Sequence, residues 1–120
     1  MKDFVTYEQA LELKELGFDE PCFGYFSYEE LVIEGRYKNS EHGRSISAPL
    51  YQQAFRWFRE KYDLRIWIES NYGVLKFEYV IATTNPNFID KQFNDLSAYK
   101  TYEKAESACL DKLIEICKNK

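Results

Sequence analysis

The side chains in this sequence with the greatest potential for covalent chemistry are three thiols and one imidazole. The thiols belong to Cys22, Cys109 and Cys117, and the imidazole to His42. A cysteine beside a histidine base can form a nucleophilic pair. The sequence disfavours such a pair, because His42 lies in a polar segment, whereas the cysteines lie among apolar residues, as buried structural thiols do. We therefore expect all three cysteines to be structural, and a thiol-dependent enzyme is the least favoured function.

Other patterns that carry catalysis are also missing from the sequence. A single histidine and widely spaced cysteines do not provide the cluster of ligands that a metal site requires. The five glycines are isolated, so there is no glycine-rich phosphate loop, and no serine lies in a nucleophile-elbow motif. The sequence predicts no metal, no cofactor and no catalytic residues, and hence a protein that is not an enzyme.

Cations interleaved with aromatic residues form the first candidate binding site. They lie in the segment 36–44, whose charged and ring-bearing members are Arg36, Tyr37, Lys38, Glu41, His42 and Arg44. Single-stranded RNA sites combine attraction to the backbone with stacking on the bases, and protein interfaces use the same residue types as hot spots. The sequence leaves three interpretations open: a protein-binding surface, an RNA-binding surface, and a solvated loop with no binding role.

A second candidate binding group lies within the segment 48–70, beside its apolar stripe. Its members are the basic residues and tryptophans outside the apolar stripe: Arg56, Trp57, Arg59, Arg65 and Trp67. In an alternating strand Trp67 shares a face with Arg65 and Glu69, opposite the aliphatic residues. Either another layer covers that face or Trp67 marks a binding surface. We expect the segment 83–98 to cover Trp67.

The segment 48–70 also organises the predicted fold. Apolar and aromatic residues first recur at helical spacing, at Tyr51, Ala54, Phe55, Phe58 and Tyr62. Arg56 and Glu60 are four residues apart on the other face and can form an ion pair. After residue 63 the period changes to two, which is typical of a half-buried strand. A helix leading directly into a strand is therefore predicted.

The remaining elements follow from capping and turn signals. A helix is predicted over residues 7–16, with a capping box between Thr6 and Gln9 and an end at Gly17, and another over 102–118. Strands are predicted over residues 22–27, 31–37, 64–70 and 74–81. The segment 27–30 is either a hairpin turn or a second helix start, and the hairpin is favoured because a helix would meet Gly35. Residues 38–47 are expected to form a loop, and residues 83–98 a covering loop or a short helical turn.

Length and composition favour one α+β domain over residues 1–120, in the order α-β-β-α-β-β-α, with antiparallel hairpins packed against helices. The chain of 120 residues is 45% hydrophobic, 30% charged and 18% aromatic, which suits a globular protein with a small core. Its net charge of −4 makes nucleic-acid binding over the whole surface unfavourable. There is no apolar run that could span a membrane and no apolar signal core at the start, and the cysteines are few and odd in number. These features predict a cytoplasmic protein without membrane partners.

Three stretches carry a resemblance to a known group of proteins: TYEQALELKELGFDEPCFGYF, APLYQQAFRWFREKYDLRIWIES and TYEKAESACLDKLIEICK, in that order. Together they resemble a family of small proteins from Bacteroidetes phages and prophages. The resemblance implies a non-catalytic accessory protein in the host cell cytosol that binds and modulates a host protein or ribonucleoprotein complex. An anti-CRISPR inhibitor of an RNA-guided nuclease is one such protein. The resemblance transfers no functional residue, and a small RNA-binding domain is the alternative.

Overall fold

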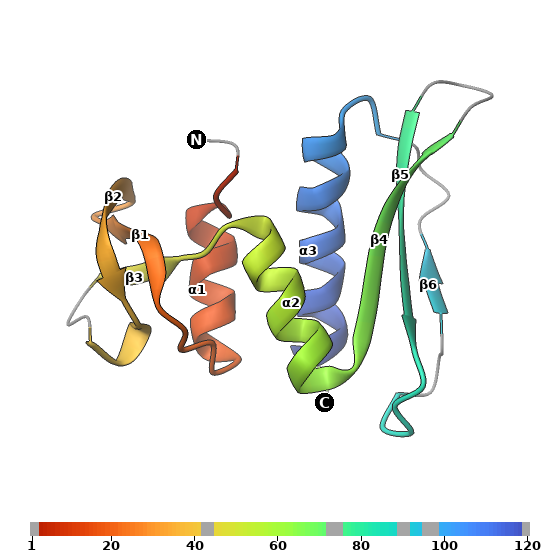
Figure 1. Cartoon of the computed structure of the whole chain (residues 1–120), viewed down its shortest axis with the longest axis horizontal. Coiled ribbons are helices and arrows are strands. Elements are labelled where there is room, and N and C mark those ends of the chain that lie inside the picture. The colour runs from red at the N-terminus through yellow and green to blue at the C-terminus, as the bar shows by residue number, and fades with distance from the viewer. Residues whose placement is uncertain (1–2, 42–44, 72–75, 89–91, 95–98, 119–120) are drawn as a thin grey trace. The chain divides into compact units, whose positions relative to one another are not determined.

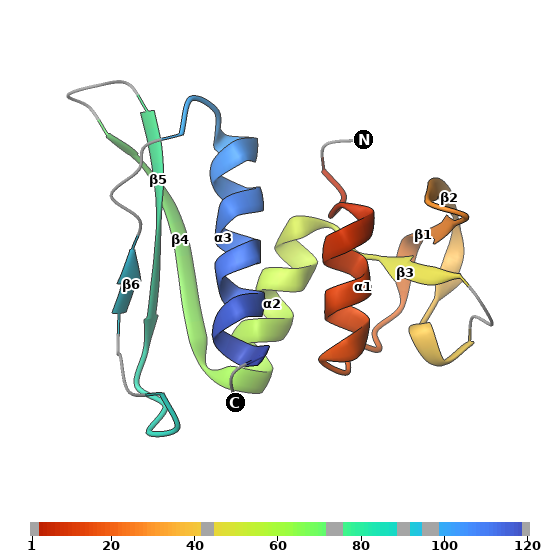
Figure 2. The ribbon, with the colours of Figure 1, turned by 180° about the vertical axis from the view of Figure 1, so that it is seen from behind.

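A computed structural model describes residues 3–41, 45–71, 76–88, 92–94 and 99–118 (Figures 1 and 2). The chain divides into two compact units, residues 1–54 and 55–120. The helix α2 (Tyr51–Tyr62) contains the boundary between them. The α+β class is confirmed, and the predicted order of elements agrees with the structure except for additional short elements. A single domain over residues 1–120 stays a prediction.

The first unit combines helix α1 (Tyr7–Glu15) with an antiparallel sheet. The sheet has the order β2-β1-β3 in the described residues, from β1 (Cys22–Ser27), β2 (Glu30–Tyr37) and β3 (Ile46–Ala48). Helix α1 packs against β3 (Figure 1). The core of the first unit includes Phe4, Leu13, Phe18, Cys22, Phe26, Ile46 and Tyr51.

The capping box predicted for α1 is confirmed. The Thr6 hydroxyl accepts a hydrogen bond from the Gln9 amide at 3.2 Å, and Gln9 Oε1 accepts one from the Thr6 amide at 3.0 Å. The same Oε1 accepts a second hydrogen bond, from the buried Tyr51 hydroxyl at 3.1 Å. The cap that starts α1 therefore also fixes the side chain that begins α2. Gly17, with φ of 97°, follows the end of α1 as predicted.

The segment 27–30 is a hairpin turn and not a helix start. Ser27 pairs with Glu30, and the two residues between them, Tyr28 and Glu29, have φ of 51° and 68°. Positive φ at both central positions is the type I′ pattern, whose twist suits a two-residue hairpin. Strand β2 is irregular further along, where the register shifts and Gly35 has φ of 68°.

The segment 38–47 is more ordered than predicted, because it contains the 3₁₀ helix η1 (Asn39–Glu41) and most of β3. Asn39 is buried and links two backbones: its Nδ2 donates to the Phe18 carbonyl at 2.8 Å, and its Oδ1 accepts from the Ser47 amide at 2.8 Å. The three residues of β3 pair with β1. A strand this short shows no recognisable period and could not be predicted from the sequence.

The second unit combines helix α3 (Tyr102–Lys118) with a sheet of order β4-β5-β6 in the described residues. These strands are β4 (Leu64–Asn71), β5 (Lys76–Thr83) and β6 (Gln92–Asn94). Helix α3 lies along one face of the sheet and packs mainly against β5 (Figures 1 and 2). The predicted faces are confirmed, since Ile66 pairs with Ile81 and Ile68 with Tyr79. The core of this unit includes Phe58, Leu64, Tyr79, Ile81, Phe88, Leu110 and Leu113.

Strand β6 was not predicted. It lies within the segment 83–98, which was expected to be a loop or a short helical turn, and it pairs Phe93 with Ile81 at the edge of the sheet. Its three residues again show no recognisable period. The predicted strand over 74–81 is shifted to Lys76–Thr83, and residues 74–75 lie outside the described part of the chain.

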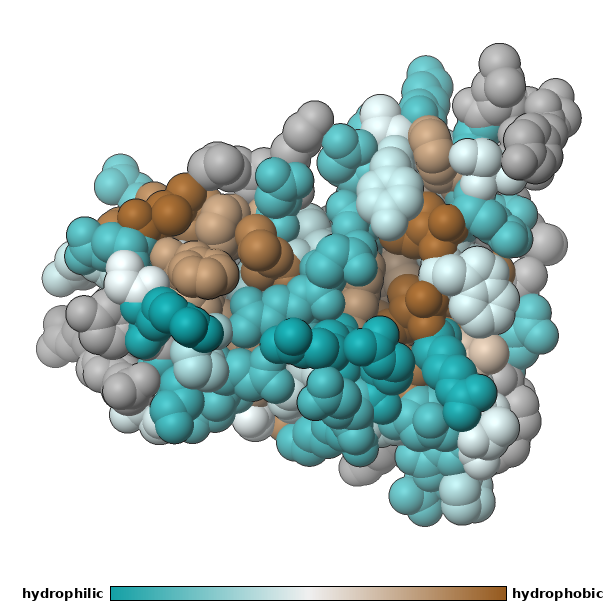
Figure 3. All heavy atoms as spheres, viewed as in Figure 1, coloured by the Kyte–Doolittle hydropathy of each residue, from teal (hydrophilic) through white to brown (hydrophobic). Residues whose placement is uncertain are grey.

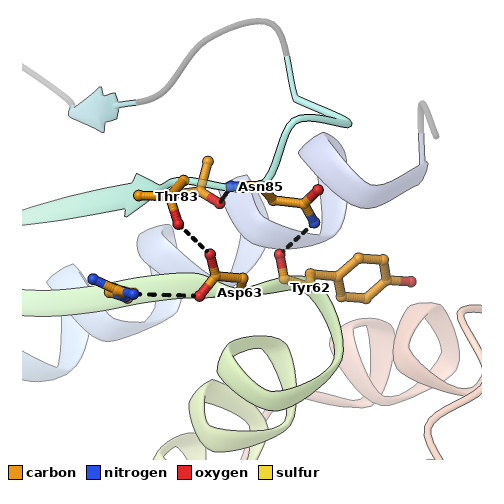
Figure 4. Close-up of polar contacts among 6 residues, drawn as sticks. Tyr62, Asp63, Thr83 and Asn85 are labelled. Carbon is orange, nitrogen blue, oxygen red and sulfur yellow. Dashed lines mark hydrogen bonds and ion pairs between the residues drawn. The ribbon is translucent and has the colours of Figure 1, made fainter.

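A polar corner joins the end of α2 to the start of β4 and the end of β5 (Figure 4). The Thr84 hydroxyl donates to Asp63 Oδ2 at 2.8 Å, and Asn85 Nδ2 donates to the Tyr62 carbonyl at 2.9 Å. Asp63 has φ of 59°, in the left-handed region where helices commonly end. Arg65 lies 3.7 Å from the other oxygen of Asp63. The corner therefore sets the direction in which β4 leaves the helix.

Candidate functional site

The predicted basic loop is only partly described. His42 and Arg44 lie outside the described residues, and Tyr37 is the last residue of β2, where its backbone pairs with Cys22. The Arg36 guanidinium lies 5.3 Å from the centre of the exposed Phe23 ring, a cation–π contact.

The charge of Lys38 acts on a carboxylate of the same unit, that of Asp19. The Ser40 amide donates to Asp19 at 2.8 Å. Hydrogen bonds from Ser40, and then the charge of Lys38, lower the pKa of the Asp19 carboxyl below its usual value. The two cations therefore have different neighbours: the charge of Lys38 acts on Asp19, whereas Arg36 lies over the exposed Phe23 ring.

The basic residues predicted around the central segment lie in the second unit. Arg56 forms the predicted ion pair with Glu60, at 3.7 Å. Arg65 pairs with Asp63, also at 3.7 Å, and Arg59 is exposed on α2. Both ion pairs are largely exposed to solvent, so each adds little to stability. A role for these residues in binding stays a prediction.

The two tryptophans differ from what the sequence predicted. Trp57 was placed with the candidate binding residues but is buried, with its ring 5.0 Å from Phe58 and 5.8 Å from Tyr62 in edge-on contacts. The apolar stripe of α2 is thus wider than the spacing indicated. Trp67 was expected to lie under the segment 83–98 but is 46% exposed, on the face of β4 away from the aliphatic residues.

The exposed apolar residues of the β1–β2 hairpin were not among the binding residues predicted from the sequence. Phe23 is 54% exposed, Ile33 50% and Tyr28 90%. We call these three residues, together with Arg36, the hairpin surface. In Figure 3 apolar side chains are visible at the surface over β1 and β2. Tyr28 could have been found from its position, because a two-residue hairpin turn directs both of its residues into solvent.

A pocket of about 340 Å³ lies beside the turn of this hairpin. It is lined by Tyr7, Phe26, Ser27, Tyr28, Ser45 and Ile46. The rings of Tyr7 and Phe26 meet edge to face, with centres 5.6 Å apart. Among the described residues, this lining combines aromatic rings with hydroxyl groups and includes no carboxylate, amine or imidazole. Such a lining suits an apolar group with a polar end and not acid–base chemistry.

The thiols are poorly suited to catalysis. All three cysteines are free and buried. Burial, followed by the nearby Glu20 charge, raises the pKa of Cys22 to about 12, and its thiol donates to the Glu20 carbonyl at 3.3 Å. Burial also raises the pKa of Cys109, with a contribution from Glu106. A nucleophilic cysteine requires a lowered pKa, because the thiolate is the reactive form.

Within the described residues, no group of three or more His, Cys, Asp or Glu side chains could hold a metal ion. No helix in that part of the chain is long and apolar enough to cross a membrane.

Comparisons of the chain with protein-family models, with curated proteins and with solved structures gave no match.

Proposed function

We propose that this chain is a non-catalytic binding protein that contacts a protein partner through the hairpin surface. The observation that carries the proposal is the state of Tyr28. This large aromatic residue is 90% exposed at the tip of the β1–β2 hairpin, and its backbone has φ of 51°. The Tyr28 side chain is hardly buried in its own fold, and its backbone has a positive φ, which non-glycine residues disfavour.

The turn sequence is unfavourable for folding alone. Type I′ turns favour Asn-Gly, because both central residues have positive φ. Here the two positions hold Tyr28 and Glu29, each of which costs on the order of 1 kcal/mol in that region. Strain of this kind accumulates at functional sites, where the side chain is needed for something other than stability. Recognition by Tyr28 accounts for its presence at the turn.

The other members of the hairpin surface are of the types that dominate protein interfaces. Aromatic residues and arginine are enriched among interface hot spots. Arg36 lies over the Phe23 ring, so both side chains are held together before a partner binds. The pocket beside the turn has room for a side chain of the partner next to Tyr28.

The class of partner is proposed from the resemblance to phage and prophage proteins. This resemblance supports a host protein or ribonucleoprotein complex in the host cytosol as the binding partner. It also supports the more specific proposal that the chain is an anti-CRISPR inhibitor of an RNA-guided nuclease. The raised pKa values of Cys22 and Cys109 support binding rather than thiol catalysis.

The test is affinity purification of the tagged full chain from phage-infected or lysogenic host cells. We expect a host protein to co-purify with the wild type and to be lost with Tyr28→Ala and with Phe23→Ala. The matched control is Tyr102→Ala, which removes an exposed tyrosine from α3 in the second unit. Equal capture by Tyr28→Ala and the control would contradict the proposal.

The same experiment separates the RNA-binding alternative. Purification is repeated after nuclease treatment, and binding of RNA by the isolated chain is measured at increasing salt. A protein partner is retained after nuclease treatment. Direct RNA binding that falls steeply with salt would contradict the proposed function and support the alternative.

A further inference from the structure

The outer edge of β4 differs from the other sheet edges in the described residues. The sheets β2-β1-β3 and β4-β5-β6 have their edges at β2, β3, β4 and β6. Proteins protect edge strands by making them short or irregular. Strands β3 and β6 have three residues each, and β2 is interrupted by its register shift and by Gly35.

Strand β4 carries none of these protections. It has eight residues without proline, glycine or lysine, and its pairing with β5 runs without a bulge from Leu64 to Asn71. Only one side of β4 is paired in the described part of the chain. An edge that is long, regular and unpaired is a template for adding another strand.

The residues of β4 are arranged symmetrically about Trp67. The sequence from residue 65 to 69 reads Arg-Ile-Trp-Ile-Glu. When a strand pairs antiparallel with a copy of itself about Trp67, Arg65 lies opposite Glu69 of the copy, Ile66 opposite Ile68, and Trp67 opposite Trp67. Residues that lie directly opposite share a face, so each charged pair and the tryptophan pair meet on the same side.

We propose that two copies of this chain associate through β4, antiparallel and centred on Trp67, to form a continuous sheet of order β6-β5-β4-β4-β5-β6. The occupant of the edge is a second copy, because the strand is complementary to itself in charge. If the pairing were centred on residue 66 or residue 68 instead, Arg65 would lie opposite Trp67 or Asn71. Neither residue is acidic, so the charge pairing would be lost. The centred register is therefore selected by charge.

Burial on both faces supports the same register. On the outer face, Trp67 is 46% exposed and would be covered by its symmetry mate. On the inner face, α3 packs mainly against β5, and Ile66 and Ile68 at the edge are only half-buried. Pairing with a second copy covers these isoleucines with each other. Within the described ranges Arg65 forms an exposed ion pair with Asp63 through one nitrogen, and a guanidinium has further donors that can reach a second carboxylate.

Sedimentation equilibrium of the full chain over a range of concentrations tests the association. We expect a reversible dimer. Arg65→Glu or Glu69→Arg raises the dissociation constant by about tenfold, because two attractive cross-strand pairs become repulsive. The double variant with both reversals restores the wild-type association. The charge-matched controls Arg59→Glu and Glu15→Arg, at exposed helix positions, leave it unchanged.

Cross-linking tests the register independently. Under mild oxidation Trp67→Cys forms an interchain disulfide, because residue 67 lies opposite itself. Ser70→Cys does not, because its two copies are about 20 Å apart in this register. A monomer up to millimolar concentration, failure of the double reversal to restore the dimer, or cross-linking at residue 70 instead of 67 would overturn the proposal.

Discussion

Thr84 donates a 2.8 Å hydrogen bond to the carboxylate of Asp63, across the corner where α2 turns into β4. Asp63 has φ of 59°, so the hydrogen bond holds a residue whose backbone is itself disfavoured. Asn85 adds a second link from the end of β5 to the last carbonyl of α2, that of Tyr62. The corner fixes the start of β4, and with it the strand whose edge we propose to be self-complementary.

The corner makes stability depend on pH through Asp63. Hydrogen bonds from Thr84, and then the charge of Arg65, lower the pKa of Asp63 in the folded state. A lowered pKa stabilises the fold above the unfolded value of about 3.9, and this contribution is lost as the pH falls through the folded value. We expect Asp63→Asn to be less stable than the wild type at neutral pH, with the difference shrinking in acid. Urea unfolding across that range measures this, and a difference independent of pH would contradict it.

Asn39 is expected to be the most sensitive polar residue of the first unit. It is buried and satisfies the Phe18 carbonyl and the Ser47 amide together. Asn39→Ala leaves both groups without this partner and should cost about 2–4 kcal/mol in the free energy of unfolding. The control Asn87→Ala, at an exposed position, should change it by less than about 0.5 kcal/mol.

Asn39→Asp provides a sharper test of the same contact. The carboxylate would face the Phe18 carbonyl in a buried site, so its folded pKa would lie above its unfolded value. This variant should be least stable at neutral pH and should regain stability as the pH falls and the carboxyl becomes protonated. Stability equal to the wild type at neutral pH would show that the Asn39 donor is unimportant.

The thiols should be unreactive in the folded protein. Cys22, Cys109 and Cys117 are buried, and the raised pKa values of the first two keep them protonated at neutral pH. We expect a thiol reagent such as dithionitrobenzoate to label none of them rapidly under native conditions and all three in denaturant. Rapid labelling of one thiol in the native protein would place it at an accessible site.

The longer elements could be predicted from the sequence, because each shows a clear period or cap. Thr6 and Gln9 indicated the start of α1, and the change of period after residue 63 indicated the passage from α2 to β4. Strands β3 and β6 could not be predicted, since three residues show no period and are held in place by pairing with distant strands.

The candidate site was harder to predict than the fold. The helical spacing of α2 did not show that Trp57 is buried, because a residue at the border of the stripe depends on its neighbours in space. Trp67 was expected to be covered, since a strand pattern does not show whether its second face has a layer over it. The positive φ of Tyr28 could not be read from the residue types, because Tyr-Glu is not the Asn-Gly or Asp-Gly sequence typical of such a turn, although the hairpin itself indicated an exposed position.

The most direct test of the proposed function separates the stability of the hairpin turn from binding. The double variant Tyr28→Asn, Glu29→Gly introduces the preferred type I′ sequence into the turn. We predict that its free energy of unfolding rises by about 1 kcal/mol, because strain is relieved, while capture of the host partner is lost. A variant that is more stable and still captures the partner as well as the wild type would contradict the role of Tyr28 in recognition.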